Sequence, residues 1–386
     1  MAGAGRNEYR VDAVDVHAFE VPTDGPGGRE QDGTLEWDST TMVLVRVHAG
    51  GSTGLGYTYG DVSVASFVTS QLAPLLEGRG VLAPPALWQL MGTHIRNAGR
   101  PGVGAMARSA VDVALWDLKA RLLGLPLVHL LPAPHDRVPV YGSGGFTNYP
   151  LDRLTEQLAG WADQGIPRLK LKTSREPERD PRRLTAVREA IGDEVELFTD
   201  ANGALSRKEA LYWARRFHEE WDVRWFEEPV GSADLEGLRL LRDRGPERLE
   251  IAAGEYAFTA QDFVNLVEPP AVDCLQADVT RCGGITGVLE IAGLAAARHL
   301  DLSAHCAPAV SAHAFCAVRR LRHLEYFHDH TRVEELLFDG TLSPVGGVLR
   351  PDPTRPGLGL DVKWADAERF RVYEAHPVGS RAREEG

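Results

Sequence analysis

The chain is poor in cysteine, has fewer basic than acidic residues, and lacks any long hydrophobic run. Its 386 residues include four cysteines, all in the C-terminal third, whose spacing fits neither a disulfide framework nor a paired C-x-x-C zinc site. Lysine and arginine number 42 against 55 acidic residues, a net charge of −13, which excludes a general binder of nucleic acid or anionic membranes. No run approaches the ~20 apolar residues that span a bilayer. We therefore expect a reducing, cytoplasmic compartment, with no nucleic-acid and no membrane partner.

What is present is the composition of a globular protein, with 43% hydrophobic and 25% charged residues. This balance excludes a disordered or fibrous chain. Residues 1–11 are polar and have no apolar core, so we expect no signal peptide. The length predicts two or three domains, or one large barrel with a smaller domain.

The first third of the chain has the pattern of strands followed by helices. Strands are expected where apolar and polar residues alternate, and helices where apolar residues recur with a period near 3.6. A polar stretch over residues 23–38 interrupts the strands, and loops of this length are typical of lids. The expected strands cover residues 9–20, 41–48 and 52–59, and the expected helices cover residues 63–76, 85–96 and 105–123.

From residue 138 onward, short strand-like runs alternate with helical stretches every 20–30 residues or so. Eight such runs are typical of a (β/α)₈-type barrel. They cover residues 139–141, 168–172, 196–199, 223–226, 250–253, 274–277, 302–304 and 324–327. We therefore predict a first domain over residues 1–136, a barrel over 137–345, and a segment over 346–386 that returns to the first domain and ends in a solvated tail.

Three carboxylates close three consecutive strands of this barrel, namely Asp200, Glu227 and Glu255. Unpaired carboxylates at one height would repel each other, and a hard divalent cation with all-oxygen ligands, such as Mg²⁺, relieves that repulsion. A salt-bridge network is the alternative. Glu228 is adjacent to Glu227, so we expect only one of the two to face the barrel axis. Asn202 follows on the same side as Asp200.

Two further pairs at strand ends have the residue types of acid/base catalysis. Lys170 and Lys172 share one face of the second strand, and their repulsion and desolvation favour a neutral amine that acts as a base. Two ordinary solvated lysines are the alternative. Asp278 and His305 close the sixth and seventh strands, where a carboxylate fixes the tautomer of a histidine. A structural histidine is the alternative there.

The eighth strand ends in Glu325, which either binds a substrate carboxylate in its protonated form or helps to order the site. The residues that follow it, His328, Asp329 and His330, are expected in a loop or at the surface. Cys306 either reaches the site or packs as a small apolar residue.

Taken together, these motifs resemble the enolase superfamily and, within it, the mandelate racemase and acid-sugar dehydratase branch. The resemblance covers nearly the whole chain and includes the helix over residues 105–119. The sixth strand carries Asp278 where the muconate-cycloisomerase branch has a lysine. The matching motifs are Lys170-Leu-Lys172, Asp200-Ala-Asn202, Glu227-Glu-Pro229, Gly254-Glu255, and Asp278 followed by His305.

The resemblance implies an α/β fold, a modified TIM barrel of the (β/α)₇β type beneath an N-terminal α+β capping domain. Residues 23–38 and 56–61 would be specificity loops of that domain. The resemblance assigns the Mg²⁺ cofactor to Asp200, Glu227 and Glu255. It also implies a homo-oligomer.

The resemblance also assigns the acid/base groups. Lys172 would be the base on one face of the substrate, with Lys170 beside the substrate carboxylate. His305, oriented by Asp278, would act on the other face, and Glu325 matches the glutamate of the eighth strand. Asn202, Tyr141 and His328 are the candidate substrate-binding residues.

The activity implied is Mg²⁺-dependent abstraction of the proton next to a carboxylate in a small molecule. Our first hypothesis is dehydration of a sugar acid, an aldonate or aldarate, to a 2-keto-3-deoxy acid. Racemisation or epimerisation of a 2-hydroxy acid is the alternative. A non-catalytic binding protein is the third possibility, and the complete set of polar residues at the strand ends argues against it.

Overall fold

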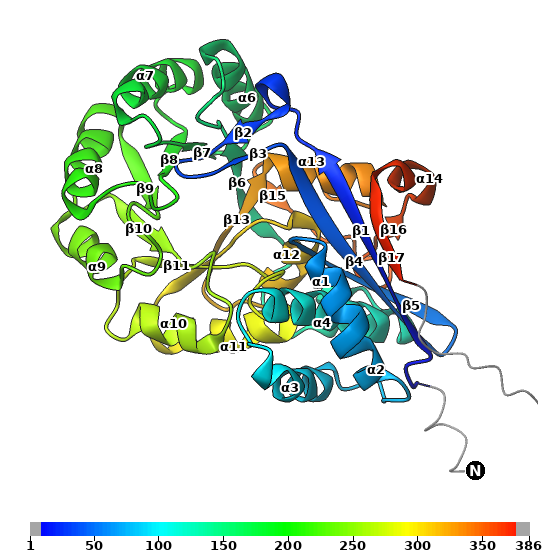
Figure 1. The fold of residues 1–386 in the computed structure, drawn as a ribbon. Helices are drawn as coiled ribbons and strands as arrows, with labels where there is room; N and C mark the ends of the chain where they lie inside the picture. The colour runs from blue at the N-terminus through cyan, green and yellow to red at the C-terminus, as the bar shows by residue number, and fades with distance from the viewer. Residues whose placement is uncertain (1–8, 376–386) are drawn as a thin grey trace, which may run out of the picture.

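The structure, a computed structural model, describes residues 9–375, which form an N-terminal domain and a barrel packed side by side (Figure 1). The predicted polar N-terminus and solvated C-terminal tail fall on residues 1–8 and 376–386, which lie outside the described residues. All four cysteines are free and buried. Within residues 9–375, no helix has the length and apolarity that a membrane span requires.

The N-terminal domain is built on a four-stranded antiparallel sheet in the order β17-β1-β4-β5. Strand β17, from the end of the chain, pairs with the free edge of β1. The predicted strands and helices of this domain are confirmed, with a π-helical turn inside the first helix. The elements are β1 Ala13–Pro22, β4 Ser39–Ala49, β5 Ser52–Tyr59, β17 Arg371–Ala375, α1 Ser63–Phe67, the π-helical turn Val68–Leu72, α2 Ala73–Leu76, α3 Pro84–His94, α4 Val103–Leu122 and α5 Leu127–Leu130.

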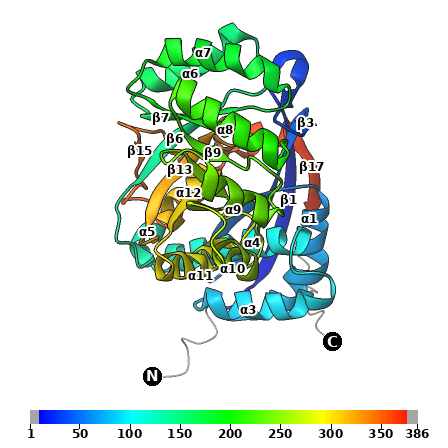
Figure 2. The same cartoon turned by 90° about the vertical axis from the view of Figure 1, so that its left-hand side faces the viewer.

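The barrel consists of eight parallel strands, and β13 pairs with β6 to close it. The eight predicted strands and the fold class are confirmed. Seven helices connect successive strands, and α13 follows the last strand. Figure 2 shows several of them, such as α7, α8 and α9, on the outside of the barrel. The strands are β6 Val138–Gly144, β7 Arg168–Lys172, β8 Glu196–Asp200, β9 Val223–Glu227, β10 Glu250–Ala253, β11 Cys274–Ala277, β12 Asp301–Ala304 and β13 Leu321–Phe327. The helices are α6 Leu151–Asp163, α7 Asp180–Ile191, α8 Arg207–Trp221, α9 Leu235–Arg244, α10 Ala260–Val267, α11 Gly284–Ala297, α12 Pro308–Phe315 and α13 His328–Leu337.

Short elements complete the fold. Strand β15 adds to β6 in the antiparallel sense, β14 pairs with β16, and β2 pairs with β3 inside the polar stretch of residues 23–38. Their bounds are β2 Glu30–Gln31, β3 Glu36–Trp37, β14 Phe338–Asp339, β15 Val348–Leu349, β16 Asp361–Val362 and α14 Trp364–Ala367.

The prediction of a specificity loop over residues 56–61 is wrong for residues 56–59. Residues 56–59 belong to β5, where they pair with β4 up to Tyr59 and Met42. Glycine is required in this strand, because a Cβ at Gly56 would lie 2.2 Å from the carbonyl oxygen of Ala110 in α4. The missing side chain allows α4 to pack directly on β5.

Helix α4 also fastens the N-terminal domain to the barrel. The buried carboxylate of Asp112 accepts hydrogen bonds from the backbone N–H and the hydroxyl of Thr286, at 2.8 and 2.6 Å. Ser109 accepts a bond from the backbone N–H of Gly283, and Trp116 donates to Thr286. Because these groups are buried and paired, separating the domains would leave several of them unsatisfied. The two domains are therefore held in one fixed arrangement.

This packing predicts that two glycine substitutions change the free energy of unfolding differently. Gly56→Ala should lower the free energy of unfolding by about 1–3 kcal/mol, because the new methyl group overlaps α4. Gly293→Ala is the matched control, because Gly293 is exposed in α11 with open space around its Cβ position. It should be neutral or stabilise the protein by up to about 1 kcal/mol. Urea unfolding of both variants measures the difference, and equal stabilities would contradict this account of the packing.

Candidate functional site

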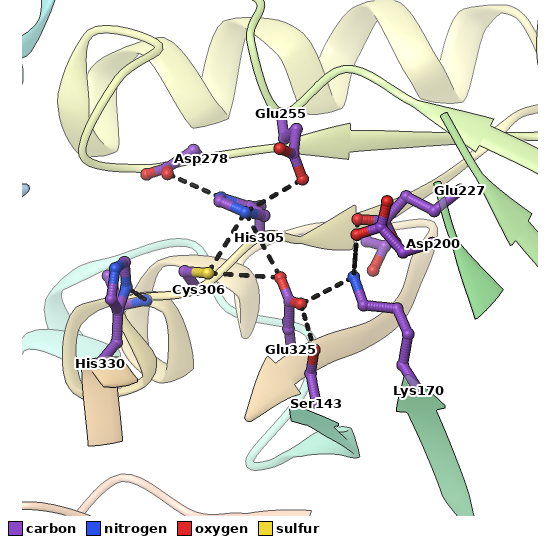
Figure 3. A network of polar contacts seen from close by, with 12 residues as sticks. Ser143, Lys170, Asp200, Glu227, Glu255, Asp278, His305, Cys306, Glu325 and His330 are labelled. Carbon is purple, nitrogen blue, oxygen red and sulfur yellow. Dashed lines mark hydrogen bonds and ion pairs between the residues drawn. The ribbon is translucent and has the colours of Figure 1, made fainter. Parts of the chain in front are cut away.

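The three predicted carboxylates lie together at the carboxyl ends of neighbouring barrel strands. In the parallel register, Lys172 is opposite Asp200, and Asp200 is opposite Glu227. Glu255 follows β10 by two residues. Oxygen atoms of Asp200, Glu227 and Glu255 lie within 4.8 Å of one another, and all three side chains are buried. The expectation that three strands present carboxylates at one height agrees with this geometry (Figure 3).

Both lysines of β7 point at this group of carboxylates. The ammonium of Lys170 donates to Glu227 at 2.6 Å and contacts Glu325 at 2.7 Å, and that of Lys172 donates to Asp200 at 2.6 Å. Burial lowers the pKa of each lysine, but the neighbouring carboxylates raise it more, so both pKa values lie above the ordinary value. The predicted shift toward a neutral amine is therefore wrong for the side chains as they stand, because carboxylate attraction outweighs the repulsion between the lysines.

His305 is held by a carboxylate on the neighbouring strand, as the sequence predicted. Its Nδ1 lies 2.8 Å from Asp278, and Asp278 in turn accepts bonds of 2.7 Å from the backbone N–H and the hydroxyl of Thr280. This arrangement fixes the ring and leaves Nε2 facing the site, 3.2 Å from Glu255. Burial lowers the pKa of His305, but the surrounding Cys306, Glu255 and Glu325 raise it by more than burial lowers it. The pKa of His305 therefore lies well above its ordinary value.

Glu325 joins the lysine side of the site to the histidine side. One of its carboxylate oxygens, Oε1, binds Lys170 and accepts a 2.6 Å bond from the hydroxyl of Ser143. The other, Oε2, accepts from the thiol of Cys306 at 3.3 Å and lies 3.5 Å from His305. The positive charge of Lys170 holds the pKa of Glu325 below its ordinary value even though burial raises it. Glu325 is thus an ionised group in the centre of the network (Figure 3).

Three residues of this region are in surroundings that the sequence pattern did not predict. Glu228 is buried beside Asp200 and Glu255, whose charges add to its burial in raising its pKa. Glu227 contacts Lys170 at 2.6 Å, as expected for the residue that faces the barrel axis, and Glu228 has a left-handed φ of 37° that interrupts the alternation of the strand. The prediction of a loop or surface position is wrong for Asp329 and His330, which are buried in the first turn of α13, where His330 stacks on Tyr59.

The three candidate substrate contacts have different positions. The side-chain oxygen of Asn202 is buried and has no hydrogen-bond partner among residues 9–375. Tyr141 is fully buried in an interior cluster with Phe198 and Trp225, with the ammonium of Lys170 over its ring, and its contact with substrate stays a prediction. His328 is partly exposed at the start of α13 and contacts Asp24 at 2.9 Å.

The polar stretch over residues 23–38 extends over the open end of the barrel. Figure 1 shows β2 and β3 beside the ends of β7 and β8. A Cβ on Gly33 would lie 2.1 Å from the carbonyl oxygen of Ala201, and Thr34 donates to the carbonyl of Asn202. The indole of Trp37 donates to Asp329 at 3.0 Å. This stretch, hereafter the lid, therefore covers the barrel immediately beside Asp200.

The residues present fit a divalent metal ion. The three carboxylates supply only oxygen ligands, the type that Mg²⁺ prefers. Their oxygens lie within 4.8 Å of one another in a buried space, and the neighbouring Oε1 of Glu228 has no hydrogen-bond partner among the described residues. Buried anionic oxygens of this kind are costly unless a cation satisfies them. A magnesium ion held by Asp200, Glu227 and Glu255 would satisfy that requirement.

Comparison with known proteins agrees with this architecture. Residues 33–132 match the family described as mandelate racemase / muconate lactonizing enzyme, N-terminal domain, and residues 153–367 match the family described as enolase C-terminal domain-like. A 3,6-anhydro-alpha-L-galactonate cycloisomerase of Streptomyces coelicolor is 33% identical over 342 residues, which cover 86% of this chain and 91% of that protein.

Two solved structures are also similar. A mandelate racemase/muconate lactonizing enzyme-like protein from Rubrobacter xylanophilus is 64% identical with a TM-score of 0.92, over 94% of this chain and 100% of that chain. The L-talarate/galactarate dehydratase of Salmonella typhimurium, liganded with Mg and L-lyxarohydroxamate, is 29% identical with a TM-score of 0.88, over 99% and 97% of the two chains. This chain therefore belongs to the mandelate racemase/muconate lactonizing enzyme family of the enolase superfamily, and it is a Mg²⁺-dependent enzyme.

Proposed function

We propose that the protein removes the proton next to the carboxylate of a sugar acid and then eliminates the oxygen substituent on the following carbon. The observation that carries this proposal is the placement of two acid/base groups on different sides of the carboxylate cluster. Lys172 ends β7 and contacts Asp200, whereas His305 follows β12 and contacts Glu255. The two side chains thus approach the same space from separate strands of the barrel.

Each residue has a role in this scheme. Asp200, Glu227 and Glu255 would hold Mg²⁺, which when bound supplies positive charge to the carboxylate oxygens of the substrate. Lys170 lies beside that position and adds a second positive charge. Lys172 would remove the proton, because Asp200 no longer stabilises its ammonium form once it serves as a metal ligand. His305, fixed by Asp278, would donate a proton to the departing oxygen on the other face.

The nature of the departing oxygen decides the product. If it is a hydroxyl group, elimination releases water and the enol becomes a 2-keto-3-deoxy acid. If the oxygen belongs to a ring, the same two proton transfers open the ring and the product is an isomer of the substrate. This common chemistry is consistent with similarity both to a dehydratase and to a cycloisomerase. We favour dehydration of an aldonate or aldarate, because the lid carries several polar residues that suit a hydroxylated substrate.

We also propose that the active form is a homo-oligomer, as the family resemblance implies. Epimerisation of a 2-hydroxy acid is the alternative reaction. In that reaction His305 would donate a proton to the same carbon from the face opposite Lys172.

Loading of the metal should stabilise the protein through the three carboxylates. A ligand that binds only the folded state at one hundred times its Kd adds about 2.7 kcal/mol of stability. Excess Mg²⁺ should therefore raise the Tm of the EDTA-treated protein, and Asp200→Asn should abolish most of this increase. Glu196→Gln is the matched control, because Glu196 is exposed at the opposite end of the same strand. An increase that survives in Asp200→Asn would place the metal elsewhere.

The acid/base roles predict the loss of turnover in two variants. Lys172→Ala and His305→Asn should each lower kcat by about 10²–10⁴-fold, the usual contribution of general acid–base catalysis. Lys208→Ala, on the exposed surface of α8, should retain normal turnover. Steady-state kinetics of the three variants provides the measurement. Full turnover in either site variant would contradict the acid/base role proposed for the substituted residue.

A panel of aldonic and aldaric acids tests the reaction itself. Incubation with enzyme and Mg²⁺ should give a 2-keto acid, detected by its semicarbazone absorbance, with a product mass lower by one water. A keto acid of unchanged mass from a cyclic sugar acid would indicate ring opening instead. A changed configuration without any keto acid would indicate epimerisation. Absence of product from the whole panel would contradict a sugar-acid substrate.

A further inference from the structure

Three potential metal ligands of different types meet beside the magnesium cluster. The Nε2 of His305 and the Sγ of Cys306 are 3.3 Å apart, Sγ lies 3.3 Å from Oε2 of Glu325, and that oxygen lies 3.5 Å from Nε2. All three residues are buried, and Figure 3 shows their side chains converging on one point. The three atoms therefore form a nearly equilateral triangle.

This triangle has the size of one face of a tetrahedral zinc site. Zinc bonds of about 2.0–2.1 Å to nitrogen and oxygen, and about 2.3 Å to sulfur, place neighbouring ligand atoms about 3.3–3.6 Å apart in a tetrahedron. The observed separations of 3.3, 3.3 and 3.5 Å match those values. A set of one nitrogen, one sulfur and one oxygen suits Zn²⁺ or Co²⁺ and does not suit Mg²⁺, which requires oxygen ligands in an octahedron.

Contacts with neighbouring residues hold the ligand side chains in position. His305 is bound through Nδ1 to Asp278, the carboxylate–histidine arrangement that orients zinc ligands. Glu325 is anchored through its other oxygen to Ser143 and Lys170, which leaves Oε2 directed at the triangle.

The third ligand is fixed by its backbone. Cys306 has a left-handed φ of 51°, and its carbonyl accepts a 2.7 Å bond from Ser311. The ligand set is therefore organised before any metal binds, which lowers the free-energy cost of forming the site.

We propose that His305, Cys306 and Glu325 form a second metal site that binds Zn²⁺ and thereby inhibits the enzyme. Binding forms bonds to Nε2, Sγ and Oε2, and both the Nε2 proton of the charged His305 ring and the thiol proton of Cys306 leave to solvent. A water molecule completes the tetrahedron. Inhibition follows because Nε2 of His305 can no longer exchange a proton with the substrate, a consequence that depends on the proposed function. Binding itself does not depend on that function.

Cobalt absorption spectroscopy tests the site directly. The full-length protein, saturated with Mg²⁺ to fill the oxygen site, is titrated with Co²⁺. We expect a near-ultraviolet sulfur-to-cobalt charge-transfer band that saturates at one equivalent, together with the strong visible bands of four-coordinate Co²⁺. Added Zn²⁺ should remove these bands. Cys306→Ser should lack the charge-transfer band and bind Zn²⁺ at least tenfold more weakly.

Cys316→Ser is the matched control, since Cys316 is a buried cysteine that contacts none of the site residues, and it should keep the band. Circular dichroism of each variant verifies folding before the titration. Absence of the band in the Mg²⁺-saturated wild-type protein, or its persistence in Cys306→Ser, would overturn the proposal. A band without any inhibition of turnover would uphold metal binding and refute the role assigned to His305, so the two failures can be distinguished.

Discussion

The arrangement of the site depends on one buried ammonium group, that of Lys170. It is completely inaccessible to solvent and lies 2.6 Å from Glu227, 2.7 Å from Glu325 and 3.4 Å from Asp200. Several carboxylates in a dry barrel interior would repel one another strongly, and removing charges from water is costly. A fixed positive charge among them offsets part of that cost and connects β7, β8, β9 and β13. The remaining negative charge makes the site receptive to a divalent cation and to the positive charge that develops on His305.

The positions of the main site residues were predictable because the barrel repeats. Each βα unit returns the chain to the same end of the barrel, so carboxylates spaced by one unit, such as Asp200 and Glu227, come into register. The hydrophobic pattern of the strands was likewise sufficient to define the fold. The same periodicity could not reveal Glu228, because its position depends on a left-handed backbone conformation at the end of β9. No pattern in the sequence predicts a left-handed backbone conformation at a glutamate.

Other features depend on contacts between distant segments, which local patterns do not encode. His330 is buried because Tyr59 of the N-terminal domain stacks on it, 271 positions away in the chain. The lid reaches the barrel because Gly33 approaches Ala201 closely. The charge state of Lys170 and Lys172 could not be predicted either. The sequence shows that the two lysines share a strand face, but it does not show which carboxylates from other strands surround their ammonium groups. The N-terminal domain thus contributes to the site by tertiary contacts, which are fixed by the α4–α11 interface.

The proposed reaction begins with removal of the proton on the carbon next to the carboxylate, so exchange of this proton with solvent is the decisive measurement. A sugar acid incubated with the enzyme and Mg²⁺ in D₂O is followed by proton NMR, with an EDTA-treated sample alongside. We expect the resonance of the proton on that carbon to disappear in the Mg²⁺ sample, through exchange or conversion, and to persist in the EDTA sample. A substrate that is converted to product while this proton is fully retained would contradict the proposed reaction.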